Sequence, residues 1–260
     1  MSEALIALPF GLAIGLVVGG VGGGGAILAL PVLVYVLGEG VGPASTASLI
    51  VIAVAAAVGA GALALRGHVC WGLALAFSGP AAAGSLLGAI ANAAVSPKVL
   101  SLAFVPILLV AAAATWRRTS GAGTDEQGEC PALSWPRILI PGFGVGVLTG
   151  FFGVGGGFLI VPVLTLWLDT SFRRAVATSL VILTLTGLAA LASHLATGSG
   201  LNVPVTVALA GSTAVGALVG TMVGGRLPQQ HLGRAFAVVV TIVAAFLLVD
   251  TVFLGGPPTG

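Results

Sequence analysis

Two glycine-rich runs hold the residue types in this sequence that are best suited to binding chemistry. Each run interrupts an apolar tract and is followed by a proline, Pro31 in the first case and Pro162 in the second. A helix that begins after such a break presents unpaired backbone N–H groups and about half a positive charge. Glycine also lets the backbone approach a bound group closely. The runs therefore predict a site for a small anion, and the candidate residues are Gly22, Gly23, Gly24, Gly25, Ala26, Gly153, Gly155, Gly156 and Gly157.

Small hydroxyl side chains follow each run, at the start of the next apolar tract. They are Thr46 and Ser48 in the first half and Thr178 and Ser179 in the second. Such hydroxyls can donate hydrogen bonds to the oxygens of an anion. Two interpretations stay open, because hydroxyls within helices also bond the carbonyl of the preceding turn. Ala47 stands where the second half has Thr178, so the hydroxyls do not form a symmetric set.

The glycine runs belong to an internal duplication. The stretch GLVVGGVGGGGAILALPVL from Gly15 superposes without a gap on GVLTGFFGVGGGFLIVPVL from Gly146, an offset of 131 residues (146 minus 15). After one inserted residue the similarity resumes, from Gly79 to Phe104 in the first half and from Gly211 to Phe236 in the second. The chain therefore divides into a first membrane repeat at 1–116, a polar linker at 117–136 and a second membrane repeat at 137–260.

The composition predicts an all-α polytopic membrane protein, with the lipid bilayer as its surroundings. Of the 260 residues, 58% are apolar and 6% are charged, whereas a soluble domain carries roughly 25% charged residues. The net charge of +2, without a basic cluster, gives no indication of nucleic-acid binding. A transmembrane helix needs about 20 apolar residues. Six tracts meet this length, at about 44–65, 71–95, 99–116, 175–197, 203–225 and 232–253.

Two glycine-broken segments, at about 4–37 and 138–168, are longer than one span and shorter than two. Basic residues distinguish crossing from folding back, since cytoplasmic loops are enriched in Lys and Arg. If each segment crosses the membrane once, four of the nine basic residues lie on one membrane face and five on the other. Folding back leaves Lys98 on one face and places the others on the opposite face, namely Arg66, Arg117, Arg118, Arg137, Arg173, Arg174, Arg226 and Arg234.

Folding back therefore gives each repeat a re-entrant or two-arm helical hairpin plus three transmembrane helices. The odd number of spans makes the repeats inverted, an arrangement found in many secondary transporters. Both termini are predicted to lie outside the cell, and the linker in the cytoplasm.

Glycines four residues apart occur outside the runs as well, at Gly84 and Gly88 and at Gly216 and Gly220. This spacing lets two membrane helices approach closely. Close packing is the predicted role of these four glycines, whereas the duplicated runs favour a binding site.

The sequence offers little for metal, redox or enzymatic chemistry. Cys70 and Cys130 lie 60 residues apart without a partner motif, so they are interpreted as incidental thiols near the cytoplasm, and no disulfide is predicted.

No Asp or Glu lies in the middle of a span, which disfavours a cation pump or a sodium antiporter. No cofactor is expected. Because no Lys or Arg lies mid-span either, an anion would be held mainly by amides and hydroxyls.

His194 lies near the outer end of its predicted span. It has two possible roles, proton coupling and local hydrogen bonding, of which the second is preferred. An intramembrane hydrolase would need Ser193 or Ser179 with His194. Ser193 and His194 cannot form such a pair themselves, since adjacent residues of a helix point about 100° apart. No nucleophile motif is present, so an enzyme is not expected.

The duplicated glycine stretch, followed in each half by the pattern A-x-x-x-S-L from Ala44 and from Ala175, resembles the TauE/SafE sulfite exporter family. The resemblance covers nearly the whole chain, including the polar centre and the ending GGRLPQQHLGRAF. It implies an inner-membrane permease, often acting outward, for sulfite, sulfoacetate or another small organosulfur anion.

Together these observations predict a secondary transporter of a small sulfur-containing oxyanion. No nucleotide-binding motif is present, so a proton gradient or the membrane potential would supply the energy. A passive anion channel is the alternative.

Overall fold

The computed structural model describes residues 2–92, 95, 97–120, 130–131, 134–152, 157–196 and 202–253. Within these residues every regular element is helical. The first half contains α1 (Ser2–Val21), η1 (Gly23–Gly25), α2 (Ala26–Pro31), η2 (Val32–Val36), α3 (Val41–Ala64), α4 (Trp71–Asn92) and α5 (Pro97–Ser120). The second half contains α6 (Trp135–Phe152), α7 (Gly157–Leu166), α8 (Phe172–Ala196), α9 (Val203–Arg226) and α10 (Gln229–Phe253).

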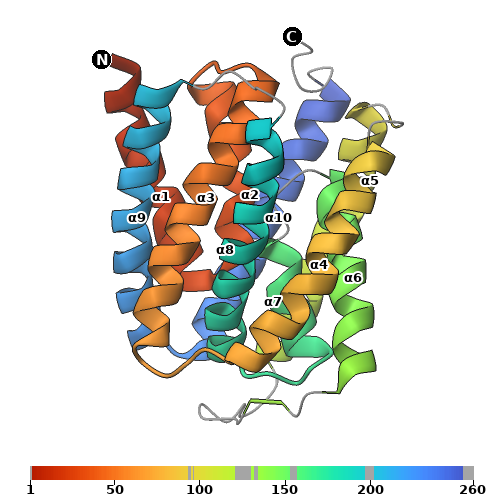
Figure 1. The fold of residues 1–260 in the computed structure, drawn as a ribbon. Helices are drawn as coiled ribbons and strands as arrows, with labels where there is room; N and C mark the ends of the chain where they lie inside the picture. Colours follow the sequence, from red (N-terminus) through yellow and green to blue (C-terminus); the bar gives the residue numbers. More distant parts are fainter. Residues whose placement is uncertain are drawn as a thin grey trace.

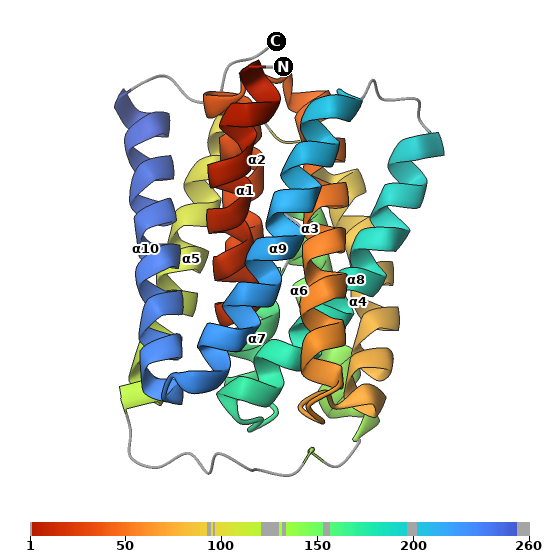
Figure 2. The same cartoon turned by 90° about the vertical axis from the view of Figure 1, so that its left-hand side faces the viewer.

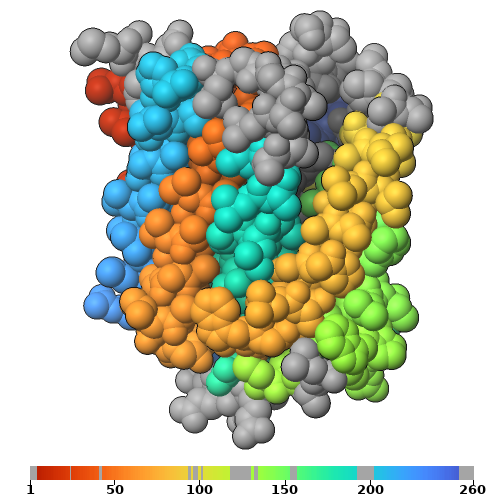
Figure 3. All heavy atoms as spheres, in the orientation of Figure 1, coloured from red at the N-terminus to blue at the C-terminus, as the bar shows by residue number. Residues whose placement is uncertain are grey.

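Six of these helices are long and apolar enough to span a membrane, which confirms the predicted all-α polytopic membrane protein. The six predicted spans correspond to α3, α4, α5, α8, α9 and α10. By length and composition five of these are among the six helices, and the sixth is α6 instead of α5, whose apolar stretch, Leu102–Arg117, is shorter. One face of the bundle is covered by α3, α4, α8 and α9 (Figure 3). Large apolar side chains such as Leu75, Ile90 and Val207 are exposed on these helices, as expected for contact with lipid tails.

Each half begins with a helical hairpin. Helix α1 starts at the end of the bundle that carries both chain termini, and α2 returns to that end after the turn at η1 (Figures 1 and 2). Helix α6 starts at the opposite end, which we name the linker end, and α7 returns there. After the first hairpin, Nδ2 of Asn202 donates to Oε1 of Glu39 at 2.7 Å. After the second, the N–H of Phe172 donates to Oε1 of Gln229 at 3.1 Å.

The two hairpins thus enter the bundle from opposite ends. The inverted relationship between the two halves stays a prediction from the sequence, and these chain directions support it. The described spans run alternately between the two ends, so Arg66, Arg173 and Arg226 all lie at the linker end.

The first arm of the second hairpin packs against a helix of the first half. A Cβ atom on Gly84 of α4 would collide with the carbonyl oxygen of Phe143 in α6, and one on Gly88 would collide with that of Val147. The backbones of α4 and α6 are therefore in direct contact, which confirms the packing role predicted for these two glycines.

The first arm of the first hairpin makes the matching contact with α9 of the second half. A Cβ atom on Gly216 would collide with the carbonyl oxygen of Leu12, and one on Gly220 with that of Leu16. The packing role predicted for Gly216 and Gly220 is confirmed too. Each hairpin is held by a helix of the other half, so the halves are interlocked rather than side by side.

The interpretation of the two cysteines as incidental thiols is wrong. Cys70 and Cys130 form a disulfide, with an S–S distance of 2.01 Å. The connection between α3 and α4 and the described end of the linker both lie at the linker end, which brings the two thiols together although 60 residues separate them. Nη1 of Arg174 lies 3.4 Å from Sγ of Cys130. The spacing of two cysteines in a sequence carries no information about this proximity.

Candidate functional site

The tip of the first hairpin is shaped by Gly22. Its φ of +81° is a backbone conformation that residues with a side chain rarely adopt. A Cβ atom here would also lie 2.9 Å from Oγ of Ser179 and 3.1 Å from Cγ2 of Val161. The tip therefore approaches the second half of the chain closely, and it brings together two predicted site residues, Gly22 and Ser179.

The two hairpin tips touch. A Cβ atom on Gly23 would collide with the backbone of Gly157, including its carbonyl group. The N–H of Ala26 donates to the carbonyl oxygen of Gly23, so it is not available to a ligand in this conformation. At this contact the backbones are closely packed, and there is no room for an anion between Gly23 and Gly157.

The other predicted glycines of the second tip, Gly153, Gly155 and Gly156, lie outside the described residues. Gly24 and Gly25 belong to η1, and Gly25 packs back against Val18 of α1. The set of residues proposed for the glycine site thus stays a prediction.

The serine hydroxyls of the two halves behave alike. Oγ of Ser48 donates to the carbonyl oxygen of Ser45, and Oγ of Ser179 donates to that of Val176, both at 2.8 Å. Each serine therefore makes the bond to the preceding turn that was one of the two interpretations left open.

The two predicted threonines are buried, as the serines are. Oγ1 of Thr178 accepts the N–H of Cys70 at 3.2 Å, just before α4 begins, so Thr178 faces the α3–α4 connection rather than the tip. Thr46 is buried. Ser193 and His194 belong to α8, but their side chains are outside the described part of the chain, so the roles weighed for them are not tested.

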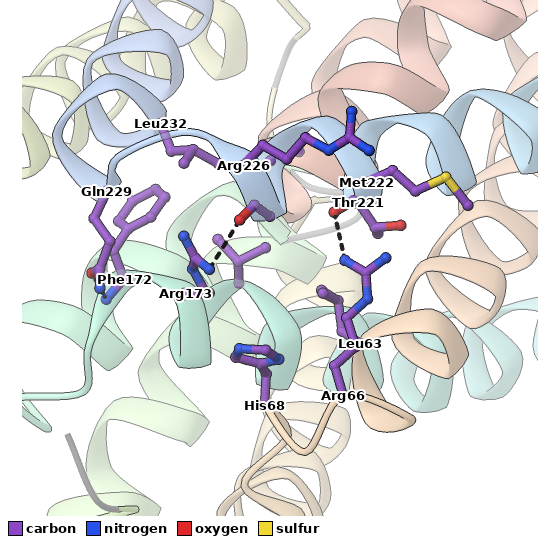
Figure 4. A pocket seen from close by; sticks show the side chains of 15 residues that line it. Leu63, Arg66, His68, Phe172, Arg173, Thr221, Met222, Arg226, Gln229 and Leu232 are labelled. Carbon is purple, nitrogen blue, oxygen red and sulfur yellow. Dashed lines mark hydrogen bonds between the residues drawn. The ribbon is translucent and has the colours of Figure 1, made fainter. Parts of the chain in front are cut away.

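A cavity of about 400 Å³ lies at the linker end and reaches inward to Gly19 and Gly20 of α1. Figure 4 shows its polar side chains. Its lining comes from the ends of α3, α8, α9 and α10 and from the α3–α4 connection. The polar side chains of the lining are Arg66, His68, Arg173, Thr221, Arg226 and Gln229.

The lining of this pocket is strongly positive. It includes three arginines, and no Asp or Glu is among its described residues. Nη1 of Arg66 donates to the carbonyl oxygen of Thr221 at 3.2 Å. Nη1 and Nη2 of Arg173 donate to the carbonyl oxygens of Gly225 and Leu227 at 3.1 and 3.2 Å. Both arginines thus cap the C-terminal end of α9, whose dipole favours cations.

His68 lies between these arginines (Figure 4). Burial, together with the charges of Arg173, Arg174 and Arg66, lowers the pKa of His68 below its ordinary value. The histidine is therefore neutral near pH 7, and the positive potential of the pocket comes from the guanidinium groups.

The sequence does not predict this pocket. In the sequence Arg66, Arg173 and Arg226 indicate orientation only, and neither His68 nor Gln229 belongs to the predicted site. The feature that these five residues share in the sequence is their position near the end of a predicted span, on the same membrane face. Which helix ends converge is decided by packing, so no local pattern could have identified the pocket.

A second cavity, of about 270 Å³, lies nearer the end that carries the termini. It is lined by the halves of α3, α4 and α8 that face this end, and by parts of α6 and α7. Its lining includes Ser45 and Gly150, which the 131-residue offset relates to Val176 and Gly19 of the first cavity. Two cavities thus approach the touching tips from opposite ends of the bundle.

Comparisons with known proteins relate the chain to membrane transporters. A "Probable membrane transporter protein" of Xylella fastidiosa strain Temecula1 is 28% identical over 260 residues, covering 95% of this chain and 96% of the relative. The protein of the same description from strain 9a5c is 27% identical over the same shares of the two chains. The "Probable membrane transporter protein YunE" of Bacillus subtilis is 28% identical over 131 residues, 50% of this chain and 48% of the relative. No solved structure matches the chain significantly.

The family model described as "Sulfite exporter TauE/SafE" matches residues 7–247. This range covers the chain from the second turn of α1, through the linker, to all but the last few residues of α10. The chain is a multi-pass membrane transporter, and it belongs to the TauE/SafE sulfite exporter family.

Proposed function

We propose that the protein is a secondary transporter that exports a small sulfur-containing oxyanion, such as sulfite or sulfoacetate, across the inner membrane. The observation that carries this proposal is the contact between Gly23 and Gly157, with one cavity approaching it from each end of the bundle. A transporter that works by alternating access needs a barrier at mid-depth and a path to it from both sides.

The close packing between helices of the two halves defines two helix pairs that could move as units. Helix α1 is fixed to α9, and α6 is fixed to α4, by glycine contacts between their backbones. A rotation of one of these pairs relative to the other would separate the tips and expose their backbone N–H groups to one cavity at a time. Backbone of this kind is tolerated at membrane depth only where it is buried or lines a cavity.

The chemistry of the described residues favours an anion. The second cavity is lined by hydroxyls and glycine backbone, and the described lining of the pocket at the linker end has arginines and no carboxylates. With the linker in the cytoplasm, as the basic residues predict, the positive pocket would collect the anion on the inside. The membrane potential, negative inside, would then drive the anion outward.

Flux through proteoliposomes tests this proposal. Purified protein reconstituted in liposomes should move radiolabelled sulfite or sulfoacetate, and an imposed potential or proton gradient should change the rate. Saturation of the rate with concentration distinguishes a transporter from a passive anion channel, whose flux rises in proportion to concentration. If no small sulfur oxyanion moves under any gradient, the proposal is wrong.

A further inference from the structure

We infer that the pocket at the linker end is a binding site in its own right for a small oxyanion, with Arg173 and Gln229 as its hydrogen-bond donors. This site lies outside the predicted glycine site and would hold the anion before it reaches the tips. The identity of the anion rests on the proposed function, whereas the existence of the site rests on the following contacts.

The first observation concerns the side-chain amide of Gln229. Only 5% of its surface is exposed, and Nε2 of its amide has no hydrogen-bond partner among the described residues. The orientation of the amide is fixed, because the N–H of Phe172 can only donate and Oε1 of Gln229 accepts it at 3.1 Å. An N–H donor therefore lies buried in the pocket wall without an acceptor, a situation that proteins seldom leave unsatisfied.

The second observation concerns the guanidinium group of Arg173. Both of its Nη atoms are bonded to backbone carbonyls at the end of α9, while Nε is buried and has no partner among the described residues. The two bonds hold the guanidinium group in place, so its free N–H is positioned before any ligand arrives. A donor that is already fixed loses little conformational entropy on binding.

A purely structural role does not explain these atoms. Capping of α9 by Arg66 and Arg173 uses their Nη atoms, and needs neither the Nε donor nor Gln229. Nδ1 of His68, in the same lining, is also buried without a partner. Water can occupy such a pocket, but three guanidinium charges without a described carboxylate favour an anion over water.

Two helix N-termini lie at the pocket, beside the C-terminal ends of α3 and α9 near which Arg66 and Arg173 are bonded. Helix α8 begins at Phe172 and α10 begins at Gln229, so the N-termini of two long helices lie at the pocket. A sulfite, sulfonate or sulfate group presents several oxygens that can accept the Arg173 and Gln229 donors together. The headgroup of an anionic lipid presents similar oxygens, so an experiment has to separate the two sources.

The test compares Gln229→Glu with Gln230→Glu. The first substitution keeps the oxygen that accepts from Phe172 and replaces the Nε2 donor by a negative charge. The second adds the same charge one residue away, at an exposed position outside the pocket lining. Binding of sodium sulfite, and of sodium sulfate, is measured by calorimetry on lipid-depleted protein in neutral detergent, with choline chloride as the salt control.

We expect Gln229→Glu to weaken sulfite binding by about tenfold or more, because it removes a charge-assisted hydrogen bond and adds repulsion. Gln230→Glu should stay within about twofold of the unmodified protein. Arg173→Lys keeps the charge but loses the Nε donor, and should weaken binding in the same direction.

Equal affinity in all variants would overturn the site, as would failure of the unmodified protein to bind either free anion. Stabilisation by phosphatidylglycerol alone, dependent on Gln229, would assign the pocket to lipid and likewise overturn it. A different result would contradict the proposed function alone. In that case free sulfite binds in a Gln229-dependent manner, but no flux is measured in liposomes.

Discussion

Gly23 and Gly157 are in direct backbone contact, so the tips of two hairpins that enter the bundle from opposite ends meet at these residues. Neither residue tolerates a side chain in this arrangement. The contact explains the glycines without a ligand, and in the proposed transporter it is the place where a path between the two cavities would open.

Substitution of Gly23 by Ala tests the contact. The added methyl group would collide with the backbone of Gly157, so the tips cannot close as described. We expect a loss of most coupled sulfite flux in proteoliposomes, or its replacement by a leak. Gly61→Ala is the control, because a Cβ atom at Gly61 of α3 has nothing within 4 Å. Unchanged coupled flux in Gly23→Ala would contradict the role of the tips as a barrier.

The interlocking of the halves can be measured as stability. A valine at Gly216 would force α9 away from α1, and overpacking of this kind costs about 1–3 kcal/mol. A valine at Gly211 in the same helix faces open space, so Gly211→Val should change the stability much less. The free energy of unfolding is measured by titration with denaturing detergent. Equal effects of the two substitutions would show that the α1–α9 contact contributes little.

Anion affinity in the pocket should depend on pH through His68. The arginine charges and burial lower the pKa of His68 in the free protein. A bound anion offsets these charges and raises that pKa, so binding is accompanied by proton uptake. Affinity should therefore increase as the pH falls to and below the ordinary histidine value of about 6.5.

Sulfate is a suitable probe for this measurement, because it stays dianionic over the relevant pH range. His68→Asn should abolish the increase in affinity. His231→Asn, at an exposed position outside the pocket lining, should preserve it. An increase that survives in His68→Asn would assign the proton to another group.

The orientation of the linker end can be tested with the cysteines. In a Cys70→Ser variant, Cys130 is a single exposed thiol. Because cytoplasmic loops are enriched in basic residues, we expect a membrane-impermeant maleimide to label Cys130 in inverted vesicles but not in intact cells. Labelling of intact cells would place the linker end outside, in a compartment where the Cys70–Cys130 disulfide of the unmodified protein would persist.

The sequence by itself determined the membrane class and five of the six helices long enough to span a membrane, and it predicted the duplication and the helix breaks at the glycine runs. These are local properties, since hydropathy is averaged over about 20 residues and a glycine run breaks a helix wherever it is placed. The packing role of Gly84, Gly88, Gly216 and Gly220 could be predicted for the same reason, because the spacing of small residues is visible within one helix.

Only the tertiary structure decided what these elements face. It paired Cys70 with Cys130, closed Gly23 against Gly157, and brought Arg173 and Gln229 to one pocket. Each of these pairs joins residues that are between 56 and 134 positions apart (229 minus 173, and 157 minus 23). Their proximity follows from which helix faces pack together, and hydropathy does not specify those faces because nearly every face of these helices is apolar.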